Sequence, residues 1–99
     1  MNRVVITGLG IVSSIGNNAK EVLGSLQAGK SGITSNEDMI EYGFRSQVAG
    51  DIKLDVKDFV DKRTLRFMGP GAAYAHIAME QAIKDAGLEE NEISNFRTG

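Results

Sequence analysis

The sequence predicts an α/β fold that opens with a strand and a helix and continues through short strands to a long helix. Two observations carry this prediction. Residues 3–7 form a β-branched run that ends in Gly8-Leu9-Gly10, and an apolar helical stripe follows over residues 19–26. Further along, the alanine-rich residues 70–86 have the composition of a single helix. A strand, a glycine turn and a helix in this order form a β-α unit.

The first strand is expected over residues 3–7, buried on both faces because its apolar residues follow one another without alternation. Asn18 is a natural helix N-cap, and Glu21 three residues later completes a capping-box pattern. Apolar residues then recur at helical spacing as far as Leu26. Gly29 can adopt the left-handed conformation that ends a helix, so the first helix is predicted to stop there.

The middle of the chain carries weaker signals. Residues 31–34 and 46–50 are compatible with short strands, with a loop or a single helical turn over residues 36–41 between them. Residues 51–61 mix isolated apolar residues with charges and are expected at the surface.

A second, long helix is predicted from Gly69-Pro70 to about Ala86, with Gly87 as its stop. This helix is apolar on nearly all sides, which predicts a long buried helix inside a larger structure. Residues 89–95 are expected to be a polar connector. We therefore expect residues 1–99 to be one partial N-terminal domain of a longer protein, cut before its next element.

Composition excludes several classes of function. Hydrophobic residues make up 41% of the 99 and charged residues 24%, as in a globular protein. The net charge of −2 argues against a nucleic-acid binder. The apolar run near the start is broken by Thr7-Gly8, so neither a signal peptide nor a membrane anchor is expected, and a cytoplasmic location is predicted.

Residue counts and motifs predict no catalytic group within the chain. The sequence has no cysteine, which excludes thiolate catalysis and zinc–thiolate sites, and His76 is its single histidine. Ser13-Ser14 lacks a positioned base, so structural hydroxyls are the better interpretation. Gly8-Leu9-Gly10 lacks the third glycine of a dinucleotide-binding turn, which favours a tight strand exit. No metal or cofactor is expected.

Four basic residues form the candidate binding site: Arg45, Lys62, Arg63 and Arg66. The last three would share one side of a helical turn, because positions three and four apart are neighbours on a helix. One interpretation is a solvated face whose charge is offset by nearby aspartates; these are Asp55, Asp58 and Asp61. The other is a surface that docks an acidic protein. On the residues alone, the solvated face is favoured.

Several segments, in order, resemble one family along the whole chain. They are residues 4–18, 29–33, 66–68, 73–75 and 80–88. Together they resemble the β-ketoacyl synthases, and the Ser-Ser-Ile-Gly-Asn-Asn and Arg-Phe-Met details are closer to the synthase I group than to synthase II. Gly69-Pro70-Gly71 departs from the more polar helix start common in that family.

The resemblance implies a thiolase-like fold with α-β-α-β-α layers and a condensing acyltransferase of fatty-acid biosynthesis. Such enzymes join a malonyl group on acyl carrier protein to an acyl chain held on a cysteine, with two histidines and an oxyanion hole. In the family these groups lie beyond position 99. The resemblance therefore implies that this stretch supplies scaffold, is inactive alone, and works with the rest of the synthase and a second subunit in a homodimer.

For the candidate site, the resemblance implies a specific partner. Positions matching Arg45, Lys62, Arg63 and Arg66 lie where acidic acyl carrier protein docks in synthase I, which now favours docking over the solvated face. The alternative function is a stand-alone module that binds acyl carrier protein, and a dinucleotide-binding domain ranks last. An open strand edge and an apolar helix also predict dimers or higher oligomers of the chain.

Overall fold

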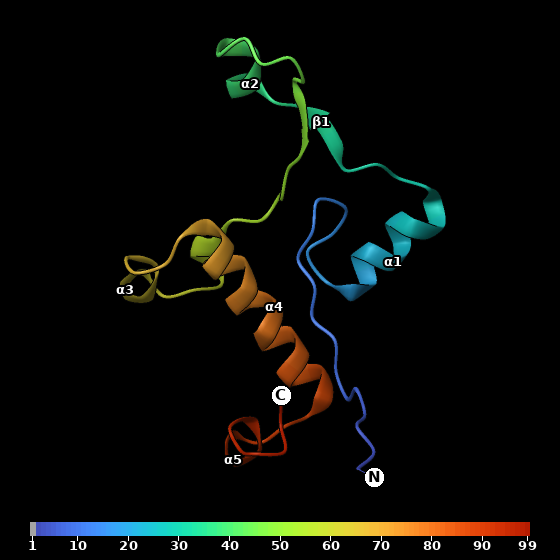
Figure 1. Cartoon of the computed structure of the whole chain (residues 1–99), viewed down its shortest axis with the longest axis vertical. Coiled ribbons are helices and arrows are strands. Elements are labelled where there is room, and N and C mark those ends of the chain that lie inside the picture. Colours follow the sequence, from blue (N-terminus) through green and yellow to red (C-terminus); the bar gives the residue numbers. More distant parts are fainter. Residues whose placement is uncertain (1) are drawn as a thin grey trace. The chain divides into compact units, whose positions relative to one another are not determined.

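A computed structural model describes residues 2–99 of the chain. The described residues divide into two compact units, one formed by residues 2–11 with 55–99 and the other by Val12–Leu54. Figure 1 follows the chain through both units from its blue start to its red end. Helices together with a two-stranded sheet are consistent with the predicted α/β class.

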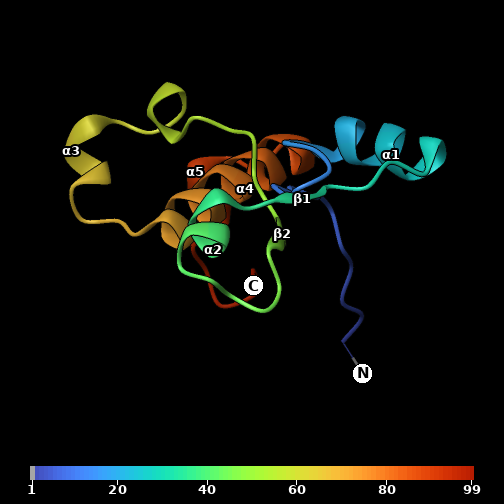
Figure 2. The same ribbon diagram turned by 90° about the horizontal axis from the view of Figure 1, so that it is seen from above.

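The unit Val12–Leu54 contains two helices and a small sheet. Its elements are α1 (Ala19–Ala28), β1 (Ile33–Ser35), α2 (Glu37–Glu41) and β2 (Val48–Gly50). The two strands pair antiparallel, and α2 lies in the connection between them (Figure 2). The predicted short strands, with a helical turn between them, are confirmed.

Local signals fix both ends of α1. The Asn18 side-chain oxygen accepts a hydrogen bond from the Glu21 backbone N–H at 2.9 Å, and the Asn18 amide group donates to the Glu21 carboxylate at 3.0 Å. Gly29 ends the helix in the left-handed conformation, with φ of 66°. The predicted N-cap and stop of this helix are therefore confirmed.

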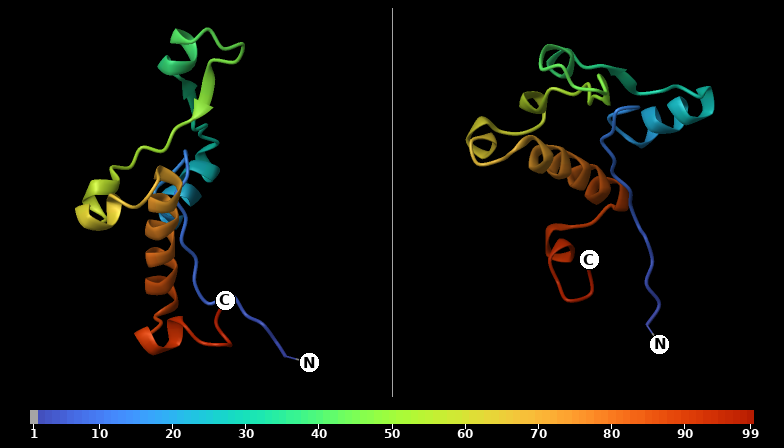
Figure 3. Two further views of the ribbon diagram at one scale, coloured as in Figure 1. Left: turned by 60° about the vertical axis from the view of Figure 1, so that its left-hand side comes forward. Right: turned by 45° about the horizontal axis from the view of Figure 1, so that its top comes forward.

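The other unit is built around one long helix. Its elements are η1 (Val56–Asp58), α3 (Lys62–Leu65), α4 (Pro70–Ala86) and α5 (Glu90–Ile93). Figure 3 shows α3 near one end of α4 and α5 near the other. Proline stands at the start of α4 and Gly87 ends it with φ of 68°, as predicted. The predicted polar connector instead contains α5, whose capping box joins Glu89 to Glu92.

Most of α4 is not buried by residues 2–99, and its burial inside a larger structure stays a prediction. Only Ala73 and Ile77 of the helix are buried, together with Val60 from the segment before α3, and Met79 is 61% exposed. A helix that is apolar on nearly all sides needs neighbours on every side to be buried. The other described residues of this unit cover α4 only in part.

The strand predicted over residues 3–7 is wrong. The segment is not a strand, and Val4 and Ile6 are 89% and 92% exposed. Gly8 and Gly10, which follow this segment, lie against α4, and the dark-blue end of the chain leads away from that helix (Figures 1 and 3). A strand requires a backbone ladder with a neighbour, and no other described residue forms backbone hydrogen bonds with residues 3–7.

Candidate docking surface

The basic residues nearest one another lie on the short helix α3. The Leu65 N–H donates to the Asp61 carbonyl at 3.0 Å, and Arg66 continues the helical backbone as the C-cap. Lys62 and Arg66 are therefore one turn apart, with Arg63 three positions before Arg66. The sequence placed these three residues on one side only on the condition that the segment is helical, and the segment is helical here.

All three basic side chains of α3 are exposed. Within residues 2–99, the structure places no carboxylate within ion-pair distance of Lys62, Arg63 or Arg66. The nearby Asp55 instead accepts a hydrogen bond from the Lys57 N–H at 3.0 Å. The absence of ion pairs among the described residues is compatible with both interpretations, a solvated face and a docking surface. We call Lys62, Arg63 and Arg66 the α3 basic surface.

Arg45 is exposed, but it belongs to the unit Val12–Leu54 and not to the unit that holds α3. Its place in a shared docking site stays a prediction.

The hydroxyl-bearing and imidazole groups have structural partners. The Ser13 hydroxyl donates to the Gly16 carbonyl at 3.4 Å and accepts from the Ile15 N–H at 3.3 Å, inside one tight turn. His76 lies 3.2 Å from the Glu80 carboxylate, one turn away on α4. Both arrangements agree with the structural interpretation of these residues.

The glycine turn does not have dinucleotide-binding geometry. In that motif the glycines open directly into a helix, whose N-terminus faces the pyrophosphate. Here α1 begins only at Ala19, and Gly8 and Gly10 lie against the backbone of α4. The two glycines allow the N-terminal segment to pack closely against α4.

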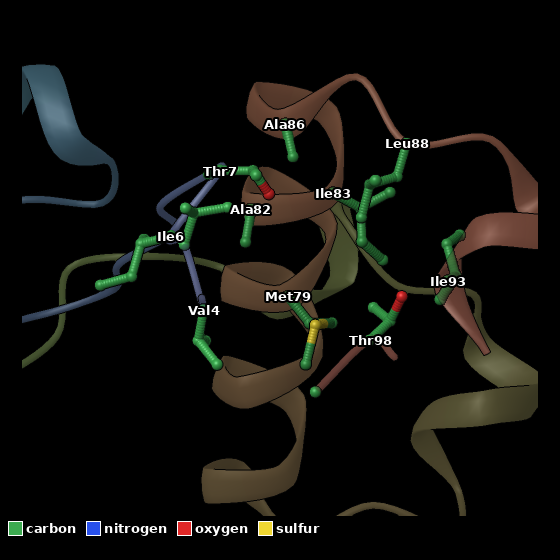
Figure 4. A pocket seen from close by; sticks show the side chains of 13 residues that line it. Val4, Ile6, Thr7, Met79, Ala82, Ile83, Ala86, Leu88, Ile93 and Thr98 are labelled. Atoms are coloured by element: carbon green, nitrogen blue, oxygen red, sulfur yellow. The ribbon is translucent and has the colours of Figure 1, made fainter. Parts of the chain in front are cut away.

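A hollow of about 450 Å³ lies beside α4 in the same unit. Its walls come from residues 4–8 of the N-terminal segment, from α4 and α5, and from residues 98–99 (Figure 4). Met79, Ile83 and Leu88 are among its lining residues, and no charged side chain lines it. The hollow is an uncovered apolar face, and its polar side chains are the hydroxyls of Thr7 and Thr98.

Residues 2–99 contain no group of three or more histidine, cysteine, aspartate or glutamate side chains placed to hold a metal ion. Over the same residues, every helix is too short or too polar to cross a bilayer.

Comparison with known proteins gives a consistent result. Residues 1–99 match the family model described as the beta-ketoacyl synthase N-terminal domain. The chain is 57% identical over 99 residues to 3-oxoacyl-[acyl-carrier-protein] synthase 1 of Haemophilus influenzae, covering 100% of this chain and 24% of that protein. Identity to synthase 1 of Escherichia coli K12 is 53% over 95 residues, covering 96% of this chain and 23% of that protein.

Synthase 2 of Vibrio cholerae is 37% identical over 98 residues, covering 98% of this chain and 24% of that protein. The greater similarity to synthase 1 confirms the resemblance found in the sequence. The chain spans about a quarter of the length of these curated relatives. It belongs to the beta-ketoacyl synthase family, and it matches the N-terminal domain of that family along its whole length.

Proposed function

We propose that this chain acts as the N-terminal part of a condensing acyltransferase of fatty-acid biosynthesis. The whole protein would transfer the acyl group of a thioester to malonyl-acyl carrier protein, yielding 3-oxoacyl-acyl carrier protein, carbon dioxide and the thiol that had held the acyl group. Family membership and the names of the synthase 1 relatives support this role. The proposal includes thiolase-like layers, to which the N-terminal segment and α4 would contribute, and assembly with a second synthase subunit in the cytoplasm.

Within that protein, the chain would supply scaffold and part of the docking surface for acyl carrier protein. The observation that carries this role is the α3 basic surface, with three exposed cations on one helical turn and no carboxylate partner among the described residues. Complementary charge steers an acidic partner into place and raises the association rate. Arg45 would extend this surface in the assembled protein.

A binding titration with acyl carrier protein tests the docking role. The variant K62E/R63E/R66E should weaken binding by about tenfold or more, because three favourable charge interactions become repulsive. Its affinity should also fall less as salt rises, because salt screens the remaining attraction and the new repulsion alike. The single variant R45E tests whether Arg45 belongs to the same surface and should weaken binding to a smaller extent.

The matched control is K20E/K30E/K53E, which makes the same change in net charge at three exposed lysines of the other unit. It should bind acyl carrier protein as the unaltered chain does. Docking through α3 would be refuted by equal binding of K62E/R63E/R66E, or by an equal loss in the control.

The condensing role is tested separately from docking. The chain alone has no cysteine, so incubation with acyl- and malonyl-acyl carrier protein should give no 3-oxoacyl product. Joined to the remaining sequence of its own gene, it should give product. Product from the chain alone would refute the scaffold role. Binding without any product from the whole protein would favour the stand-alone binding module.

A further inference from the structure

Two polar side chains of α4 hold the N-terminal segment by its backbone. The Leu9 N–H donates to the Asp85 carboxylate at 3.0 Å, and the Ile11 N–H donates to the Gln81 side-chain oxygen at 3.1 Å. These contacts join positions 76 and 70 residues apart in the sequence. They are the interactions that a neighbouring strand would otherwise supply to such amides.

The spacing of the two contacts explains why they form together. The donors are two residues apart, a rise of roughly 6.6 Å in extended chain. The acceptors are four residues apart on α4, a rise of roughly 6 Å along a helix. Because the two rises nearly match, both amides can reach their acceptors at once.

The glycines of the segment reinforce the same alignment. A Cβ atom on Gly10 would lie 1.8 Å from the Ala78 carbonyl oxygen, and one on Gly8 would lie 2.4 Å from the Ala82 carbonyl oxygen. Neither distance is sterically possible, and both obstacles are backbone atoms. A slip by one residue would bring the Cβ of Leu9 to the place of a glycine, so steric contact excludes it.

We propose that Gln81 and Asp85 are positioning residues that set the register of residues 8–11 on α4. The glycine contacts and the side-chain hydrogen bonds follow the same spacing. In both cases, residues two positions apart in the segment contact residues four positions apart on α4. The segment can thereby keep its place on α4 without a paired strand. This role concerns how the chain holds its own N-terminus, and it does not depend on the proposed function.

Amide hydrogen exchange on the 99-residue chain, followed by NMR, tests the proposal. In the unaltered chain, the Leu9 and Ile11 amides should exchange at least about tenfold more slowly than the unbonded amides of Val5 and Ile6, because only the former are hydrogen-bonded. Equal exchange rates at these four amides would overturn the proposal, whatever the variants do.

Paired substitutions separate an acceptor role from simple packing. D85L removes the acceptor and should abolish protection at Leu9, whereas D85N keeps an acceptor oxygen and should restore it. Q81M and Q81E form the same pair for Ile11. Protection of the Ile77 amide on α4 reports whether the helix stays folded in each variant. Loss of protection in D85N and Q81E equal to that in D85L and Q81M would also overturn the proposal.

Discussion

Single atoms decide where the N-terminal segment can lie on α4. Gly10 has no room for a methyl group, because the Ala78 carbonyl occupies the place of a Cβ. A Cβ on Gly24, in the middle of α1, would meet no atom within 4 Å beyond its chain neighbours and the backbone of its own helix. A methyl group is therefore excluded at Gly10 and tolerated at Gly24, and the same substitution should change the free energy of unfolding in opposite directions at the two positions.

We expect Gly10→Ala to lower the free energy of unfolding by about 1–3 kcal/mol, the usual cost of overpacking. Gly24→Ala is the matched control and should raise it by about 0.5–1 kcal/mol, because alanine favours the helix. Urea denaturation of both variants, followed by circular dichroism, measures the difference. A Gly10→Ala chain as stable as the unaltered one would show that the close approach to α4 is not kept in solution.

At the scale of elements, helix ends could be predicted from the sequence because their signals are local. Asn18 and Gly29 delimit α1, and Pro70 and Gly87 delimit α4, each through contacts within a few residues. Such signals need no knowledge of distant parts of the chain. The helical turn of the α3 basic surface has no such end signal, because the Asp61 side chain makes no capping hydrogen bond, and the sequence left that turn open.

The N-cap of α1 provides a test of this local control. Asn18→Ala removes the acceptor for the Glu21 N–H and should lower the free energy of unfolding by about 1 kcal/mol. Asn18→Asp keeps an acceptor oxygen and should stay close to the unaltered chain. Urea denaturation compares the two, with helix content from far-ultraviolet circular dichroism. Equal losses in both variants would point to the Asn18 amide group, which donates to Glu21, as the important contact.

The strand at residues 3–7 and the burial of α4 could not be predicted in the same way, because both depend on distant partners. An apolar β-branched run favours a strand, but it forms one only beside another strand. Here the amides of Leu9 and Ile11 meet side chains at least 70 residues away, and no sequence pattern signals that pairing. The position of Arg45 relative to α3 could not be predicted for the same reason, because it depends on how separate segments assemble.

At the scale of the whole molecule, both units leave large apolar side chains in solvent. Val4, Ile6 and Phe67 are 89%, 92% and 91% exposed in one unit, and Tyr42 is 74% exposed in the other. Contiguous apolar surface and unpaired backbone favour association between chains. These properties predict that the isolated chain forms dimers or higher oligomers.

Light scattering over a range of concentrations measures this association. The apparent mass of the unaltered chain should rise with concentration, and V4K/I6K should shift the transition to higher concentration, because charge replaces apolar surface at the segment beside α4. The control Q27K/N91K adds two positive charges at exposed polar positions and removes no apolar side chain. It should associate as the unaltered chain does. If the unaltered chain stays a compact monomer at high concentration, the exposed apolar surfaces must be covered by contacts within one chain.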